Sequence, residues 1–172
     1  RNATIIFPTG YMANVGTICA LAGKDDLVIC DKLNHASIID GCRLSGATFR
    51  VYPHCNLIKL ENILKNSTHF RRKLIVTDTV FSMDGDLAPL PDIVTIAHNH
   101  NAIIMVDEAH GTGVFGKNGT GVVEHFGLNS EIDIVMGTLS KAIGSLGGFV
   151  SGDTDVINYL RNKARTFIYT TA

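Results

Sequence analysis

A lysine that follows an apolar segment is the most chemically suggestive feature of this sequence. The segment "IVMGTLSKAIGSLGG" covers residues 134–148 and contains Lys141. Five small residues follow it: Ala142, Gly144, Ser145, Gly147 and Gly148. Partial desolvation at a strand end favours the neutral amine, which can attack a carbonyl and form a Schiff base. The small residues would let a flat ligand approach. The alternative is a lysine that ends a strand and reaches water.

Asp107 follows the apolar run "AIIMV" (102–106), where a carboxylate is costly unless it is paired. A protonated pyridine nitrogen would be a suitable partner, and the pair would hold that ring as an electron sink. A helix cap or a salt bridge is the alternative role for Asp107. His110, three residues later, either touches such a ring or forms a hydrogen bond within its loop.

Weaker indications lie elsewhere in the chain. "FPTGYMANVG" (7–16) has a glycine at the entry to a helical pattern, where free N–H groups can bind phosphate. His35 begins another helical pattern and either lies flat against an aromatic ligand or caps its own helix. Asp78 and Ser82 are ambiguous when each is taken singly.

The elements that must position these residues alternate between strand and helix patterns. Strands are expected at 26–31, 47–53, 73–78, 133–141 and 147–152, and a strand that runs into a loop at 102–111. Helices are expected at 35–46, 56–66, 90–100 and 153–165. Apolar strands of this kind belong to a parallel sheet that is covered on both faces. The sequence therefore predicts one α/β domain, a three-layer α/β/α arrangement with a mostly parallel sheet.

Ligands of such sheets bind at the carboxyl ends of the strands. Polar residues collect there in each case: Asp31 and His35, Asp78 to Ser82, Asp107 to His110, and Thr138 to Lys141. This clustering is a stronger argument for a site than any single motif.

Composition excludes several other classes. The 172 residues have a net charge of -1 and 18% charged residues, so a nucleic acid or membrane-surface partner is not expected. The apolar runs are too short to span a bilayer, and no signal-peptide pattern is present. The four cysteines form no C-x-x-C pair, which argues against zinc and for reduced packing residues in a cytoplasmic protein.

Five blocks together resemble the α-oxoamine synthases, which are fold-type I enzymes dependent on pyridoxal 5'-phosphate (PLP). They are "TGYMAN", "LNHASIIDG", "TDTVFSMDGDLAPL", "VDEAHGTGVFGKNGTG" and "GTLSKAIGSLGGFVSG". The resemblance extends from about Ile5 to Thr171 and implies the large domain of this fold type. The chain begins abruptly at Arg1, so we expect an excerpt, residues 1–172, without the family's amino-terminal arm and carboxyl-terminal small domain.

The resemblance also implies roles for single residues. Lys141 matches the lysine that binds the cofactor covalently, and Asp107 matches the partner of its pyridinium nitrogen. His110 matches a histidine near the phenolic oxygen, His35 a histidine stacked on the ring, and Ser82 a serine at the ring edge. The matches to phosphate-binding positions are Gly10, Tyr11, Met12 and Thr138. Thr170 and Thr171 match a segment that reaches the phosphate of the neighbouring subunit in a homodimer. Ser140 stands where glycine is frequent in the family.

The implied reaction condenses an amino acid with an acyl thioester, with loss of CO2. The run "GTLSKAIGSLGGFVSG" is most similar to members that use alanine and a pimeloyl thioester in biotin synthesis. A glycine C-acetyltransferase is the close alternative. A non-catalytic partner subunit is a further reading, disfavoured because Lys141 and Asp107 are both present. A nucleotide-binding domain would need a G-x-G-x-x-G pattern, which is missing after the first strand.

Overall fold

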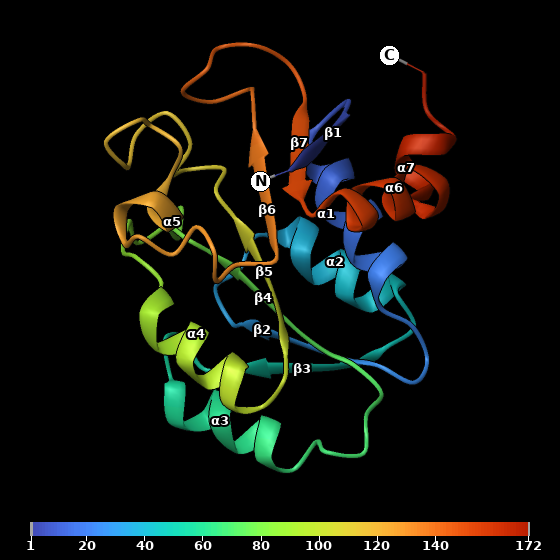
Figure 1. Ribbon diagram of the computed structural model, residues 1–172, viewed down its shortest axis with the longest axis vertical. Coiled ribbons are helices and arrows are strands. Elements are labelled where there is room, and N and C mark those ends of the chain that lie inside the picture. The colour runs from blue at the N-terminus through green and yellow to red at the C-terminus, as the bar shows by residue number, and fades with distance from the viewer. Residues whose placement is uncertain (1, 172) are drawn as a thin grey trace.

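The structure is a computed structural model that describes residues 2–171. Its centre is one seven-stranded sheet with the order β1-β7-β6-β5-β4-β2-β3 (Figure 1). The strands are β1 Ala3–Phe7, β2 Leu27–Asp31, β3 Thr48–Tyr52, β4 Lys73–Asp78, β5 Ile103–Asp107, β6 Ile134–Thr138 and β7 Gly148–Gly152. The helices are α1 Gly10–Leu21, α2 Ala36–Leu44, α3 Leu57–Lys65, α4 Leu90–Asn99, α5 Val122–His125, α6 Thr154–Lys163 and α7 Arg165–Ile168.

The sheet is mostly parallel, as the sequence predicted. The neighbours from β3 to β6 pair in parallel, whereas β7 is antiparallel to both β6 and β1. Every residue of β2 and β6 is buried, because helices cover both faces of the sheet. The carboxyl ends of β4, β5 and β6 therefore lie together at one edge.

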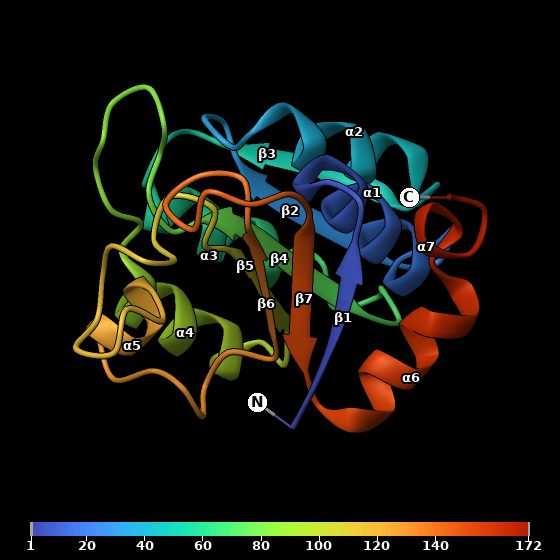
Figure 2. The ribbon, with the colours of Figure 1, turned by 90° about the horizontal axis from the view of Figure 1, so that it is seen from above.

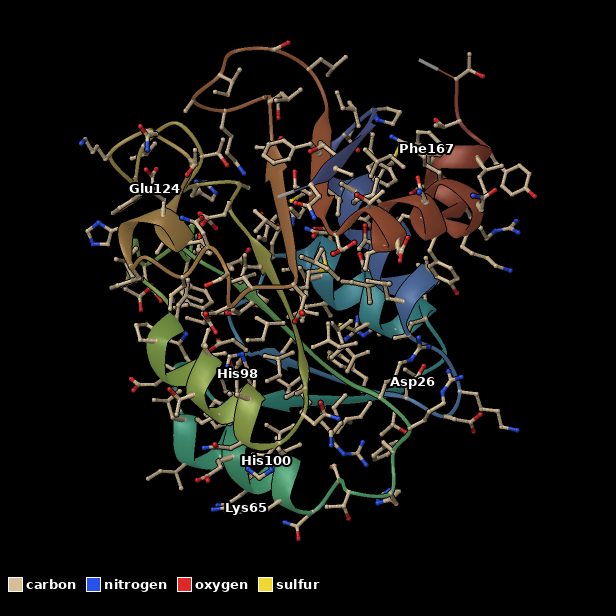
Figure 3. The ribbon with its side chains drawn as sticks, in the orientation of Figure 1. Asp26, Lys65, His98, His100, Glu124 and Phe167 are labelled. Carbon is tan, nitrogen blue, oxygen red and sulfur yellow. The ribbon has the colours of Figure 1, made fainter. Side chains whose placement is uncertain are left out.

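Helices on both faces complete the three predicted layers. Side chains of α1, α2 and α6 form one apolar core with alternate strand residues such as Val28 and Cys30. The intervening residues, such as Leu27 and Ile29, pack on the other face against α3, α4 and α5. Figure 2 shows the strands running between these two sets of helices. In α7, Phe167 packs edge-on against Phe7 of β1, with ring centroids 5.8 Å apart (Figure 3).

Several helix boundaries follow from capping residues. Thr9 caps α1 by accepting a hydrogen bond from the N–H of Met12, and Asp153 caps α6 in the same manner. Pro91 lies in the first turn of α4, as the sequence indicated. Among the described residues, no helix combines the length and the apolar character needed to cross a membrane.

One boundary and three elements differ from the sequence predictions. The strand expected over 133–141 ends at Thr138, because the chain turns there and Gly144 and Gly147 adopt positive φ. Strand β1 was not expected; it is an edge strand in which only Ile5 and Phe7 are buried, so its apolar signature is short. The four-residue helices α5 and α7 were not expected either.

Candidate active site

A cavity of about 210 Å³ lies at the predicted edge of the sheet, beside the starts of α1 and α2. It is lined by Thr9, Gly10, Tyr11, Asn14, His35, Ser37, Asp78, Ser82, Asp107, Ala109, His110, Met136, Thr138, Ser140 and Lys141. The lining thus combines carboxylates, imidazoles, hydroxyls and an amine, which are the groups expected from the strand ends.

Asp107 is the last residue of β5, and only 3% of its surface is exposed. Its Oδ1 accepts a hydrogen bond from the N–H of Ala109 at 2.8 Å, and its Oδ2 accepts one from Nδ2 of Asn14 at 2.7 Å. Each oxygen keeps a second lone pair, so the carboxylate can still accept from a cationic N–H inside the cavity. No salt bridge to Asp107 is found within residues 2–171, which leaves this capacity unused.

Asp78 lies beside Asp107 as its register partner on β4. Its Oδ2 accepts the backbone N–H of His35 at 2.7 Å. Burial, together with the negative charge of Asp107, raises the pKa of the Asp78 carboxyl well above its ordinary value. The cavity therefore holds one carboxyl group that favours its protonated form next to the carboxylate of Asp107.

His35 occupies the N-cap position of α2, which is one of the two roles that the sequence left open. Its Nδ1 accepts the N–H of Ser37 at 3.2 Å and lies 2.7 Å from Ser37 Oγ. The ring also lines the cavity and is exposed, so capping leaves it available to a ligand.

Lys141 lines the mouth of the cavity, but the structure corrects its expected environment. It lies three residues beyond the end of β6 in an exposed turn, not partly buried at a strand end. His110 is half-buried and lines the same cavity. Burial lowers the pKa of the His110 imidazole, and the positive charge of Lys141 lowers it further. His110 is therefore a neutral donor or acceptor near neutral pH.

The start of α1 forms the other end of the cavity. A Cβ placed on Gly10 would lie 3.1 Å from Cε of Met136 and 3.4 Å from Oγ1 of Thr138, so the helix start lies directly against the end of β6. Thr138 Oγ1 is 2.9 Å from Ser140 Oγ. Hydroxyls beside the first N–H groups of a helix are suited to bind an anion such as phosphate.

The loop after β5 is held by Glu108, which is fully buried. Its carboxylate accepts the N–H groups of Val122 and Val123 and the hydroxyl of Thr79, at 3.0, 2.8 and 2.8 Å. These bonds tie the start of α5 to the strand end and fix the loop that carries His110.

The structure brings eight of the predicted site residues into one cavity: Gly10, Tyr11, His35, Ser82, Asp107, His110, Thr138 and Lys141. Met12 does not line it; its N–H already bonds to Thr9, and its side chain packs toward the core. Thr170 lines a different hollow with Leu146 and Phe167, and Thr171 lies exposed outside the cavity. Asp31 ends β2 at the expected edge of the sheet, but it does not line the cavity and pairs with His54.

Sequence reasoning missed Asn14, Ser37 and Thr9. Asn14 is a polar residue within a helix segment, Ala13–Ile18, that is buried throughout. A buried amide indicates a specific partner, but the burial of this segment is known only from the structure. Ser37 lies two residues after His35, within the quoted block "LNHASIIDG".

Comparison with known proteins gives consistent matches. All residues, 1–172, match the family described as aminotransferase class I and II. The chain is 52% identical over 170 residues to 8-amino-7-oxononanoate synthase 1 of Bacillus subtilis, covering 99% of this chain and 43% of that protein. A structure of serine palmitoyltransferase from S. paucimobilis, with bound PLP–myriocin aldimine, superposes with a TM-score of 0.95 at 43% identity, covering 99% of this chain and 43% of that one.

A structure of 8-amino-7-oxononanoate synthase from Francisella tularensis superposes with a TM-score of 0.85 at 37% identity, covering 98% of this chain and 48% of that chain. The chain therefore spans less than half the length of these relatives. The matches confirm the resemblance and the fold class expected from the sequence.

Proposed function

The chain belongs to the aminotransferase class I and II family, and from this premise we propose that it is the PLP-binding part of an 8-amino-7-oxononanoate synthase. The observation that carries the proposal is the lining of one cavity by Lys141, Asp107 and the start of α1. The curated relatives support this member, with 52% identity to the Bacillus subtilis enzyme. Among the solved structures, identity is 37% to the Francisella tularensis synthase and 43% to serine palmitoyltransferase, so those two structures do not favour the synthase. Their TM-scores run the same way, 0.85 against 0.95, but backbone shape is common to both enzymes and does not decide the substrate.

The residues present fit pyridoxal phosphate. The cofactor carries an anionic phosphate, a ring nitrogen that can be protonated, and an aldehyde. Gly10, Thr138 and Ser140 would hold the phosphate, Asp107 would pair with the ring nitrogen, and Lys141 would bind the aldehyde. Asp107 has unused acceptor capacity, and Gly10 brings the start of α1 close to Thr138, which supports a ring nitrogen at one end of the cavity and a phosphate at the other.

When bound, pyridoxal phosphate supplies an electron sink for a carbanion formed next to the amino nitrogen of the substrate. The chain supplies the proton transfers and the orientation. The amine of Lys141 accepts the proton from the α-carbon of the amino acid. His110, His35 and Ser82 line the same cavity. His110 would donate a hydrogen bond to an oxygen of the cofactor or of the incoming carbonyl, and His35 and Ser82 would lie beside the ring.

The substrates follow from the proposed family member. An amino acid, L-alanine in this proposal, and a pimeloyl thioester of CoA or acyl carrier protein combine to give an amino ketone, CO2 and the free thiol. This is a cytoplasmic step of biotin synthesis. Glycine with an acetyl thioester is the second candidate, because the residues of the cavity described here are compatible with either amino acid.

We further propose that residues 1–172 form the large domain of a longer homodimeric enzyme. The coverage of 43% of the Bacillus subtilis relative supports the first part. For the second part, Ile143 and Leu146 are 52% and 76% exposed in the turn that follows Lys141, where apolar side chains favour a protein partner. Thr170 and Thr171 lie outside the cavity, and we propose that they act on the phosphate of a partner subunit.

The experiment that tests the function begins with the protein expressed from its complete reading frame. It is incubated with pyridoxal phosphate, reduced with borohydride and mapped by mass spectrometry. A phosphopyridoxyl group on Lys141 is expected, and turnover is then compared for alanine and glycine with pimeloyl and acetyl thioesters. An unmodified Lys141 in folded protein contradicts the enzymatic proposal and favours a non-catalytic subunit.

A further inference from the structure

Asn14 connects Asp107 to His35 through hydrogen bonds that run by way of Ser37. The proposed reaction gives these bonds no role. Its side chain is fully buried in α1 and lines the floor of the cavity. Nδ2 donates to Asp107 Oδ2 at 2.7 Å and to Ser37 Oγ at 2.9 Å. One amide group therefore spans two elements, the end of β5 and the start of α2.

The orientation of this amide follows from its partners. An ionised carboxylate only accepts hydrogen bonds, so the nitrogen of Asn14, not its oxygen, must face Asp107. Both amide hydrogens are then used, and Oδ1 is left buried with no partner in the described part of the chain. An unpaired buried oxygen is unfavourable for folding, which indicates that the side chain is held in place by the two bonds that it donates.

The hydrogen bonds continue from Ser37 to His35 with a defined direction. The backbone N–H of Ser37 donates to His35 Nδ1, so Nδ1 carries no proton. The hydroxyl of Ser37 accepts from Asn14 and is 2.7 Å from the same Nδ1, to which it can donate. The remaining ring proton is thereby placed on Nε2 of His35.

We propose that Asn14 and Ser37 are positioning residues that fix the Asp107 carboxylate and the His35 tautomer for a flat, cationic heteroaromatic ring. Asn14 holds Oδ2 so that a free lone pair of Asp107 stays directed into the cavity. Ser37 holds the His35 ring at the cavity wall. The inference rests on the proposed function for the identity of the ring, but the hydrogen-bond network itself exists without a ligand.

The first test uses the protein from its complete reading frame, loaded with PLP labelled with 15N at the ring nitrogen. Asn14→Leu has a similar volume and no donor, and we expect its ring-nitrogen signal to shift toward neutral pyridine. PLP affinity should fall at least about tenfold, the loss typical of one hydrogen bond to a charged group. Ser37→Ala should shift the ring-nitrogen signal in the same direction by a smaller amount. This variant provides the test if Asn14→Leu does not fold.

Thr17→Val is the matched control, because Thr17 is also fully buried in α1 and its Oγ1 also lacks a partner among the described residues. It does not line the cavity, so its ring-nitrogen signal and PLP affinity should match those of the unmodified protein. Identical ring-nitrogen signals in Asn14→Leu and Thr17→Val overturn the proposal.

A second test needs no cofactor and separates this inference from the proposed function. NMR of the ligand-free protein should show both side-chain amide protons of Asn14 shifted downfield and slow to exchange. Ser37→Ala should move one of the two and leave the other, on Asp107, unchanged. A protein that binds no PLP contradicts the proposed function. The amide signals of Asn14 still show whether its two hydrogen bonds exist. Ordinary, rapidly exchanging amide protons in the unmodified protein overturn the inference.

Discussion

Asp78 and Asp107 are register partners at the ends of β4 and β5, so two buried carboxyl groups stand side by side in the floor of one cavity. Both line that cavity, and each accepts a backbone or amide N–H. Two negative charges on neighbouring buried groups repel each other, so ionisation of both carboxyl groups at once is disfavoured. The arrangement gives the cavity a proton-holding group, Asp78, beside a group able to pair with a cation, Asp107.

The first prediction concerns Asp78→Asn, which keeps the acceptor for the N–H of His35. Burial and the charge of Asp107 raise the folded-state pKa of Asp78, so the unfolded chain releases the proton first as pH rises. The unmodified protein then loses about 1.4 kcal/mol per pH unit from about pH 4 up to the raised pKa. The variant avoids this loss. Its stability advantage should be absent at about pH 4 and grow with pH.

Urea unfolding at a series of pH values measures this difference. The comparison between the two proteins cancels the groups that they share. A constant difference across the pH range would show that Asp78 does not titrate abnormally, and the account of the paired carboxyls would then be wrong.

The second prediction is that Glu108→Gln lowers the free energy of unfolding by about 2 kcal/mol. The glutamine has one acceptor oxygen for three donors, so its NH2 group would face the N–H of Val122 or Val123. Glu61→Gln is the matched control. Its ion pair with Lys65 is exposed, so the same chemical change should cost less than about 1 kcal/mol. Equal losses in the two variants would contradict the structural role of Glu108.

Much of the fold, and the site residues at the ends of strands, were predictable from apolar runs and the residues that follow them. Asp107 and His110 were found because "AIIMV" marks a buried parallel strand, and such strands place their last residues at a common edge. Edge strand β1 was missed, because burial of only two residues, Ile5 and Phe7, gives too little pattern.

The position of Lys141 and the role of Asn14 were not predictable from local pattern alone. "GTLSK" continues the strand in composition, yet the chain leaves the sheet at Thr138, because the turn that follows it depends on Gly144 and Gly147. Asn14 meets Asp107 across 93 residues of sequence. A contact of that separation is set by the tertiary packing of α1 on the sheet.

The third prediction concerns His54, which lies between two carboxylates. Its Nδ1 is 3.0 Å from Asp31 and its Nε2 is 2.8 Å from Asp86. Burial lowers the pKa of His54, but the hydrogen bonds to Asp31 and Asp86 outweigh it, so the net pKa is raised. The interaction of protonated His54 with Asp31 and Asp86 should therefore stabilise the fold fully below about pH 6.5. This stabilisation should decrease as the pH rises through the folded-state pKa of His54.

Asp86→Asn should remove about 1 kcal/mol of this stabilisation at pH 6 and little at high pH. Glu131→Gln is the control, because its contact with His98 is longer, 3.6 Å, and exposed. Thermal melts at several pH values provide the measurement. A pH-independent effect of Asp86→Asn would mean that His54 is not charged in the bridge.

The fourth prediction is that Gly148→Ala weakens both the fold and the binding of PLP. A Cβ on Gly148 would lie 2.7 Å from Cα and 2.9 Å from N of Gly10, and 2.9 Å from the carbonyl of Thr9. These are backbone atoms, so the start of α1 must move away from β7. We expect a loss of about 1–3 kcal/mol in unfolding free energy and about a tenfold loss of PLP affinity. Gly23→Ala, with no atom within 4 Å of its Cβ, should change neither the stability nor the PLP affinity.

Urea unfolding and PLP titration of both variants measure these two effects. If Gly148→Ala lost stability but kept its affinity, the start of α1 would not be the phosphate site.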